Sequence, residues 1–168
     1  FGPDATVTGT EAAKMMLTAL GYRSDIEGFT GALWAINTQS KANQVGLYDG
    51  ITANPDSGMT RDDTAQLIYN GVQADEVMYR NNYGEYSGVI YATENGTVLE
   101  NRFHVEKVEG IVLANEVFGI DGRSATVAGK TYLNVPGGAS GAYPISMDND
   151  LVGQRVVIYV KYNNALSP

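Results

Sequence analysis

Cysteine is absent from the 168 residues of this chain, and histidine occurs once, at His104. These absences exclude disulfides, thiolate zinc sites, cysteine nucleophiles and histidine-rich metal sites. The run Asp148-Asn149-Asp150 is rich in oxygen ligands, but it lacks the spaced acids and central glycine of a calcium-binding loop. We interpret it as a solvated turn, and we expect neither a metal ion nor a cofactor.

Positive charge is also scarce. The chain has 11 Lys and Arg against 19 Asp and Glu, which gives a formal net charge of −8 at pH 7. It has no basic cluster of the kind that binds nucleic acid phosphates, and no apolar run approaches the roughly 20 residues of a membrane helix. We therefore expect no nucleic acid partner and no insertion into a membrane.

The motifs of the common catalytic classes are missing too. There is no nucleophile elbow, phosphate-binding loop, zinc-protease motif or dinucleotide-binding fingerprint, so we do not expect an enzyme. With 43% hydrophobic residues, the chain can nevertheless bury a globular core. Because it starts at Phe1 rather than methionine, we expect targeting information upstream.

An internal repeat is the most informative feature that is present. Without a gap, Pro3-Asp4 aligns with Pro55-Asp56, 52 residues later, and the same offset aligns the pairs Val7-Thr8 with Met59-Thr60, Glu11 with Asp63, Ala13 with Ala65 and Met16 with Ile68. In both copies a threonine stands three residues before an acid, which predicts a capping box at a helix start. The second copy has the weaker version, because Asp63 replaces glutamate.

Apolar residues follow each cap at helical spacing. We predict one stripe of Ala12, Met16, Ala19 and Leu20, and a matching stripe of Ala65, Ile68, Tyr69 and Val72. Gly21 is placed to end the first helix. A further helix is predicted between the copies, beginning near Trp34 and ending near Gly46, followed by a turn at Asp49-Gly50.

These residues resemble the S-layer homology (SLH) family of bacterial cell-surface proteins. The resemblance rests on Trp34-Ala35-Ile36, Ala42, Gly46-x-x-Asp49-Gly50, Pro55 and Thr60-Arg61-Asp62-Asp63-x-Ala65, which are similar to one whole repeat, and on residues 1–14, which are similar to the back half of a preceding one. The family assembles three repeats, whereas this chain has about one and a half. Gly9 also stands where the family motif usually has arginine.

The resemblance implies a non-catalytic module that anchors a secreted protein to the wall of a Gram-positive cell by binding secondary cell-wall polysaccharide. It implies an extracellular location, in the cell wall or S-layer. The ligand-binding residues implied are Arg61, Trp34, Asp49, Gly50 and Asp62. In this family the arginine meets an acidic sugar, and a guanidinium can hold a carboxylate through two parallel hydrogen bonds.

Each of these residues also has a structural interpretation. Arg61 can bridge a helix end or a neighbouring acid such as Asp62, and Trp34 can belong to the core. Asp49-Gly50 can serve as a turn, and Asp62 can serve the helix dipole.

After residue 75 the pattern changes from helical to extended. Tyr79, Tyr83, Tyr86 and Tyr91 lie among Gly and Asn in a predicted connector over 77–91. Strands are predicted at 105–113, 125–127, 130–135 and 155–161, with turns at Asn95-Gly96, Asp121-Gly122 and Ala128-Gly129. Residues 97–103 fit either a strand or a short helix.

We therefore predict an α+β chain. Helical SLH-like repeats occupy residues 1–75 (a partial repeat at 1–22 and a second at 30–74), and a small antiparallel β-barrel or sandwich occupies 76–168. Two further hypotheses stay open. In one, degenerate repeats brace the β domain or mediate self-association, also with upstream repeats. In the other, the β domain acts on wall glycans through two facing carboxylates.

Overall fold

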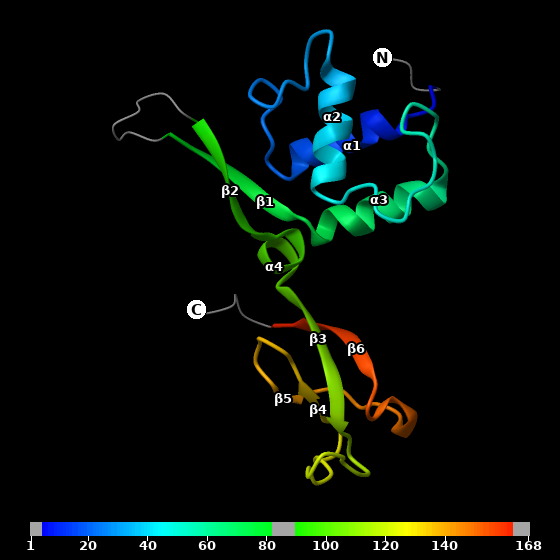
Figure 1. The fold of residues 1–168 in the computed structure, drawn as a ribbon, viewed down its shortest axis with the longest axis vertical. Coiled ribbons are helices and arrows are strands. Elements are labelled where there is room, and N and C mark those ends of the chain that lie inside the picture. The colour runs from blue at the N-terminus through cyan, green and yellow to red at the C-terminus, as the bar shows by residue number, and fades with distance from the viewer. Residues whose placement is uncertain (1–4, 82–89, 163–168) are drawn as a thin grey trace. The chain divides into compact units, whose positions relative to one another are not determined.

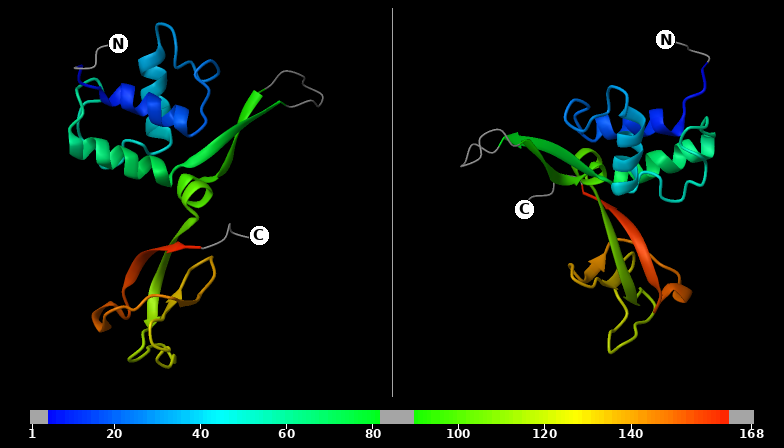
Figure 2. Two further views of the ribbon diagram at one scale, coloured as in Figure 1. Left: turned by 180° about the vertical axis from the view of Figure 1, so that it is seen from behind. Right: turned by 45° about the horizontal axis from the view of Figure 1, so that its top comes forward.

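The computed structural model describes residues 5–81 and 90–162, with the backbone alone for residues 80, 81 and 90–95. The chain divides into two compact units, Phe1–Phe103 and His104–Pro168. The predicted boundary after residue 75 falls earlier, because a strand pair and a short helix that follow it belong to the first unit. Both units appear in Figures 1 and 2. Among the described residues, no helix is long and apolar enough to cross a membrane.

Three helices form the core of the first unit: α1 (Gly9–Ala19), α2 (Trp34–Gln44) and α3 (Arg61–Gln73). Both predicted capping boxes are confirmed. The Thr8 amide donates to the Glu11 carboxylate (2.9 Å) and the Glu11 amide donates to the Thr8 hydroxyl (3.2 Å). Thr60 and Asp63 form the same pair of bonds at the start of α3. The acid in each box also lies at the positive end of its helix.

Glycines end the first two helices as the sequence predicts. Gly21 follows α1 with φ +101, and Gly46 follows α2 with φ +74. At the first end, the amides of Gly21 and Tyr22 bond back to the carbonyls of Thr18 and Leu17, and α2 repeats this pattern. Glycine adopts positive φ without steric cost, which favours it at this position of a helix end.

The buried stripes differ from the predicted ones. In α1, Ala13 and Leu17 are buried with the predicted Leu20, the predicted Ala12 and Met16 pack partly buried against this core, and Ala19 is exposed. The second predicted stripe is wrong, because Ile68 and Tyr69 are about half exposed. Instead α3 turns Leu67 and Gly71 inward, one helical turn apart. The core of the first unit consists of Ala13, Leu17, Leu20, Phe29, Ala42, Leu47 and Leu67.

The predicted connector over 77–91 is a β-hairpin in part. Strands β1 (Asp75–Asn81) and β2 (Ile90–Thr97) pair antiparallel and project from the helical part (Figure 1). Tyr83 and Tyr86, like Pro3 and Asp4 of the repeat, lie outside the described residues. The predicted Asn95-Gly96 turn is wrong: Gly96 has positive φ inside β2, where two residues of β2 lie opposite Glu76 of β1.

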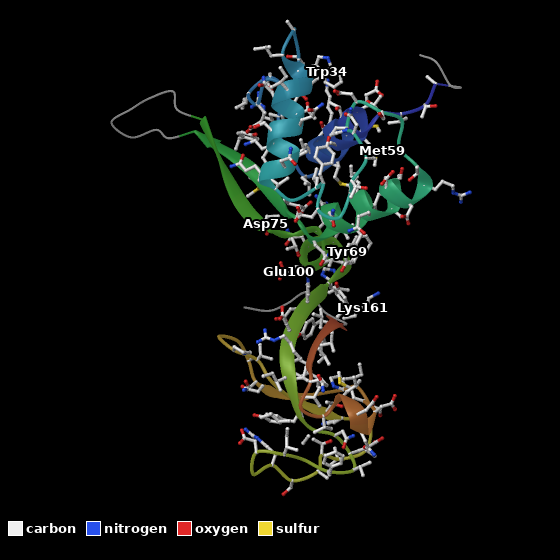
Figure 3. All side chains as sticks on the ribbon, turned by 45° about the vertical axis from the view of Figure 1, so that its right-hand side comes forward. Trp34, Met59, Tyr69, Asp75, Glu100 and Lys161 are labelled. Atoms are coloured by element: carbon white, nitrogen blue, oxygen red, sulfur yellow. The ribbon has the colours of Figure 1, made fainter. Side chains whose placement is uncertain are left out.

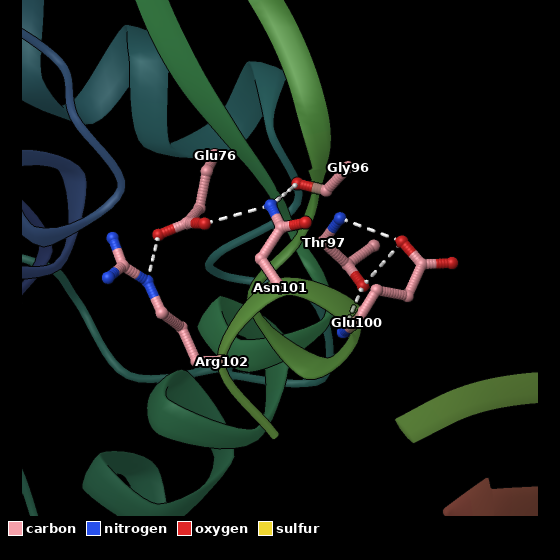
Figure 4. Close-up of polar contacts among 6 residues, drawn as sticks. All are labelled: Glu76, Gly96, Thr97, Glu100, Asn101 and Arg102. Carbon is pink, nitrogen blue, oxygen red and sulfur yellow. Dashed lines mark hydrogen bonds and ion pairs between the residues drawn. The ribbon is translucent and has the colours of Figure 1, made fainter. Parts of the chain in front are cut away.

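A helix, α4 (Val98–Phe103), resolves the ambiguous segment. Its start has the same reciprocal bonds as α1 and α3: the Thr97 amide donates to Glu100 (2.9 Å) and the Glu100 amide donates to the Thr97 hydroxyl (3.2 Å), as Figure 4 shows. Val98 packs against the helical core. A third Thr-x-x-acid cap therefore follows the two in the repeat.

The second unit is an antiparallel sheet of order β5-β4-β3-β6. Its strands are β3 (Val105–Ala114), β4 (Thr131–Asn134), β5 (Gly141–Tyr143) and β6 (Arg155–Lys161), with a 3-10 turn at Asn149–Leu151 before β6. Its core is Val108, Val112, Leu133 and Ile158. Within the described residues, β5 and β6 are the two edge strands and do not pair with each other, so the sheet is not a closed barrel. The strand predicted at 125–127 is an irregular loop, and β5 was not predicted.

Candidate functional site

A groove lies where α1 and α2 begin in the first unit. Its volume is about 730 Å³, and we call it the Trp34 groove. Its lining residues are Ala5, Thr6, Val7, Glu11, Lys14, Met15, Phe29, Thr30, Gly31 and Trp34. Figure 3 shows Trp34 at the end of α2. The volume falls within the range of small-molecule sites.

The loop before α2 shapes this groove. Phe29 is fully buried, so it forms the floor, and Gly31 turns the chain with φ +74 toward the helix start. The Asn37 side chain donates to the carbonyl of Gly28 (3.0 Å) and holds the loop against α2. Trp34, the first residue of α2, is therefore half-buried at the groove wall rather than part of the closed core.

Lys14 lies over the indole of Trp34. Its Nζ is 5.1 Å from the ring centroid, within the range of a cation–π contact. Glu11, one helical turn earlier, also lines the groove. Hydrogen bonds from the backbone and the hydroxyl of Thr8 hold the pKa of the Glu11 carboxyl below its usual value. The groove thus combines an aromatic face, an ammonium group and an ionised acid.

The groove lies beside the start of α2 and the first turn of α1, since Trp34 and Glu11 both line it. The N-terminal end of a helix carries a partial positive charge and favours anions. In α1, Glu11 already uses this potential. In α2, the N-cap Leu33 provides no side-chain cap, and the first turn of the helix has no acidic residue. This end of α2, together with Lys14, makes the groove suited to an acidic group.

The other predicted site residues lie elsewhere. None of Arg61, Asp62, Asp49 and Gly50 lines the Trp34 groove. Arg61 is exposed at the first position of α3, and within the described residues its side chain makes no hydrogen bond or ion pair, with Asp62 or otherwise. Asp62 is exposed in the first turn of α3.

Asp49 and Gly50 form a turn. Gly50 has φ +78, and the carbonyl of Asp49 accepts a hydrogen bond from the Asn70 side chain (2.7 Å). Asn70 also donates to the carbonyl of Leu47 (3.0 Å). These bonds fix the turn to α3. The backbone of this turn thus has a structural function, while the Asp49 carboxylate remains exposed.

The position of Gly9 accounts for the absence of a side chain at the first-copy equivalent of Arg61. A Cβ at Gly9 would lie 3.0 Å from the Cα of Pro55, so a side chain there would displace the backbone before α3. The Gly9 amide donates to the carbonyl of Ser57 (3.2 Å), and the Thr10 amide to that of Pro55 (2.8 Å). This position, equivalent to Arg61 by the repeat, is therefore filled by the chain itself.

Lys14 was not predicted as a site residue. The signal for it was local, because Glu11, Lys14 and Met15 lie three and four residues apart and so share one face of α1. The sequence does not show which residues lie opposite that face, because Phe29 and Trp34 are brought to it by the loop before α2. Elsewhere in the described part of the chain, no cluster of His, Asp and Glu side chains is arranged to hold a metal ion.

The comparisons with known proteins give one relative. Over an alignment of 183 positions the chain is 28% identical to the Middle cell wall protein of Brevibacillus brevis. The similarity points to the bacterial cell wall. The alignment covers 96% of this chain and 16% of that protein, so the chain spans a small part of the relative's length. No protein-family model and no solved structure matches. The SLH resemblance thus stays a prediction.

Proposed function

We propose that the first unit is a non-catalytic module that holds a cell-surface protein at the wall by binding secondary cell-wall polysaccharide in the Trp34 groove. The observation that carries the proposal is the contact between Lys14 and the Trp34 ring in an open groove. The similarity to a cell wall protein supports the location. The motifs quoted above support the class of ligand.

The chemistry of the groove fits an acidic sugar. The apolar face of a pyranose can stack on the indole of Trp34, while Lys14 and the uncapped start of α2 attract a carboxylate. With a net charge of −8, this chain repels an anionic polymer, but salt screens that repulsion beyond about 8 Å. Attraction therefore has to be local.

Arg61 is the second contact that we propose. Its exposed guanidinium at the start of α3 can bind another acidic unit of the same polymer. We assign no ligand contact to Asp49 and Gly50, whose turn is held by Asn70, or to Asp62 in the first turn of α3. Two weak contacts on one chain act together, because the first raises the effective concentration of the second.

The experiment is retention on purified wall sacculi, before and after chemical removal of their secondary polysaccharide. We expect retention that disappears with the polysaccharide, and a loss of about tenfold in affinity for Lys14→Met and for Trp34→Ala. Because Trp34 is the single tryptophan, its fluorescence reports ligand entry directly. Arg61→Ala tests the second contact separately.

Arg23→Ala is the matched control. It also removes one exposed cation from the first unit, but Arg23 pairs with Asp25 at 2.6 Å and lines none of the groove. Unchanged retention of Lys14→Met and Trp34→Ala, with both variants folded, would reject the groove as the binding site.

Self-association is the second candidate function. Ile68 is 48% exposed, and Ala65 lies one turn before it on the same face of α3. The repeat-equivalent residues of α1, Met16 and Ala13, are half-buried and fully buried. A face that is covered in one copy and open in the other suits an interaction surface. A monomer by size-exclusion chromatography with light scattering, at every concentration and in both the wild type and Ile68→Glu, would reject this candidate.

A further inference from the structure

We propose a second saccharide site in the first unit, specific for uncharged sugar units, at the opposite end of α2 from the Trp34 groove. We call it the Tyr22 cleft. It has a volume of about 360 Å³ and is lined by Tyr22, Lys41, Gln44, Val45, Gln73, Ala74 and Asp75. Figure 3 shows Trp34 and Asp75 toward the two ends of the helical part. This inference goes beyond the proposed function, since it concerns other residues and another ligand.

A neighbouring hollow of about 400 Å³ is lined by Ile26, Glu27, Gly28, Asn37, Ser40, Lys41 and Gln44. Lys41 and Gln44 line both, so the two hollows share one wall. Each is within the size range of small-molecule sites. A saccharide that occupies both hollows would therefore have at least two sugar units.

The charges at the cleft disfavour an anion. The Lys41 ammonium is 2.9 Å from the Glu27 carboxylate, and both side chains are largely buried. The positive charge of Lys41 is therefore already neutralised. Asp75 adds a carboxylate to the lining. Helices α2 and α3 both end here, at Gln44 and Gln73, and helix C-termini carry partial negative charge. At the Trp34 groove, in contrast, a helix begins, and the lining has the Lys14 ammonium beside the Glu11 carboxylate.

The polar groups suit sugar hydroxyls. The Gln44 amide carries donors and an acceptor, and a hydroxyl is both donor and acceptor. The Gln73 amide donates to the carbonyl of Tyr69 (3.1 Å), which holds this side chain in the lining. The Lys41 Nζ is 5.3 Å from the centroid of the Tyr22 ring, which places the aromatic ring and the ammonium on the same side of the cleft. An aromatic ring beside amide groups can bind the apolar face and the hydroxyl edge of a pyranose together.

The local structure holds these groups in place. The Tyr22 amide is fixed to the carbonyl of Leu17 (3.0 Å) at the end of α1. Glu27 accepts hydrogen bonds from Lys41 at one carboxylate oxygen and from Tyr79 (2.5 Å) at the other. The cleft is therefore preorganised by α1, α2 and β1, which lowers the entropic cost of binding.

The test is an NMR titration of the whole chain with two probes, N,N′-diacetylchitobiose as a neutral disaccharide and glucuronic acid as an anionic sugar. We expect the disaccharide to shift the backbone amides of residues 44, 45, 73 and 74, with a dissociation constant on the order of 1–10 mM. Glucuronic acid should leave these signals unchanged. The Trp34 indole signal should not respond to the disaccharide.

Two variants make the test specific. The double variant Gln44→Ala, Gln73→Ala should weaken the disaccharide by about tenfold or more, and Trp34→Ala should bind it like the wild type. Alanine has the highest helix propensity, so both helices should be retained, and circular dichroism checks the fold. The inference is overturned if no shift occurs up to about 50 mM disaccharide, or if the double variant binds normally. Since Trp34→Ala affects only the first site, failure of either site is recognised separately.

Discussion

Met16 occupies the space in which a side chain on Gly71 would lie. A Cβ at Gly71 would be 2.5 Å from the Met16 sulfur and 2.8 Å from its Cγ. Gly71 is buried within α3, where glycine is unfavourable by about 1 kcal/mol relative to alanine. The close approach of α1 and α3 therefore explains why a glycine occupies the interior of a helix.

We expect Gly71→Ala to destabilise the first unit by about 1–2 kcal/mol, because overpacking exceeds the gain in helix propensity. Urea unfolding followed by circular dichroism measures this. Shortening the neighbour with Met16→Ala in the same chain should recover part of the loss. A Gly71→Ala variant more stable than the wild type would show that the helices can move apart.

The three capping boxes should each contribute a similar amount to the stability of the first unit. Thr8→Ala, Thr60→Ala and Thr97→Ala each remove the hydroxyl that accepts the N3 amide, and each should cost about 0.5–2 kcal/mol. Thr52→Ala, an exposed threonine outside the helices, is the control. If Thr97→Ala behaves like the control, the cap on α4 does not stabilise the hairpin.

Glu76 should make the first unit sensitive to acid. Burial opposes its ionisation, but hydrogen bonds from Asn101 (2.9 Å) and Arg102 (2.9 Å) prevail and hold the pKa of Glu76 below its usual value (Figure 4). A depressed pKa in the folded state gives stability that is present above the unfolded-state pKa and is lost as pH falls through the folded value.

Glu76→Gln should therefore be less stable than the wild type at neutral pH and converge with it in acid. Denaturant unfolding at several pH values below neutrality measures the difference. Glu109→Gln is the control, because its pair with Arg155 in the second unit is exposed on both sides and contributes little. A constant difference between Glu76→Gln and the wild type at every pH would contradict the ion pair.

Two tyrosines should ionise late. Burial and the hydrogen bond to Glu27 raise the pKa of Tyr79 to about 12, and the bond to Glu106, together with burial, does the same for Tyr162. Raised values stabilise the folded state below the ordinary pKa near 10, and this stability is lost as pH rises through about 12. In titrations followed by tyrosinate absorbance, the variants Tyr79→Phe and Tyr162→Phe should each lose part of the absorbance change near pH 12.

Local signals predicted the helices well. Both repeat caps, the glycine ends and three strands follow from neighbouring residues, and the sequence also contains the third cap at Thr97 and Glu100. The face of α3 was not predictable, because Ile68 and Leu67 are equally apolar and only contact with α1 selects Leu67. The Trp34 groove depends on how the loop around Phe29 packs against α1, and local sequence patterns do not predict such a contact between distant residues.

The backbone bridge between Thr8 and Gly58 limits how this chain can be divided. The amide of Met59 also donates to the carbonyl of Val7 (3.0 Å), so the lead-in to the second copy is paired with the start of the first. The copies are thus repeats in sequence but a single folding unit. A cut between them would leave both with broken pairing, and such contacts across some fifty residues slow folding by raising the contact order.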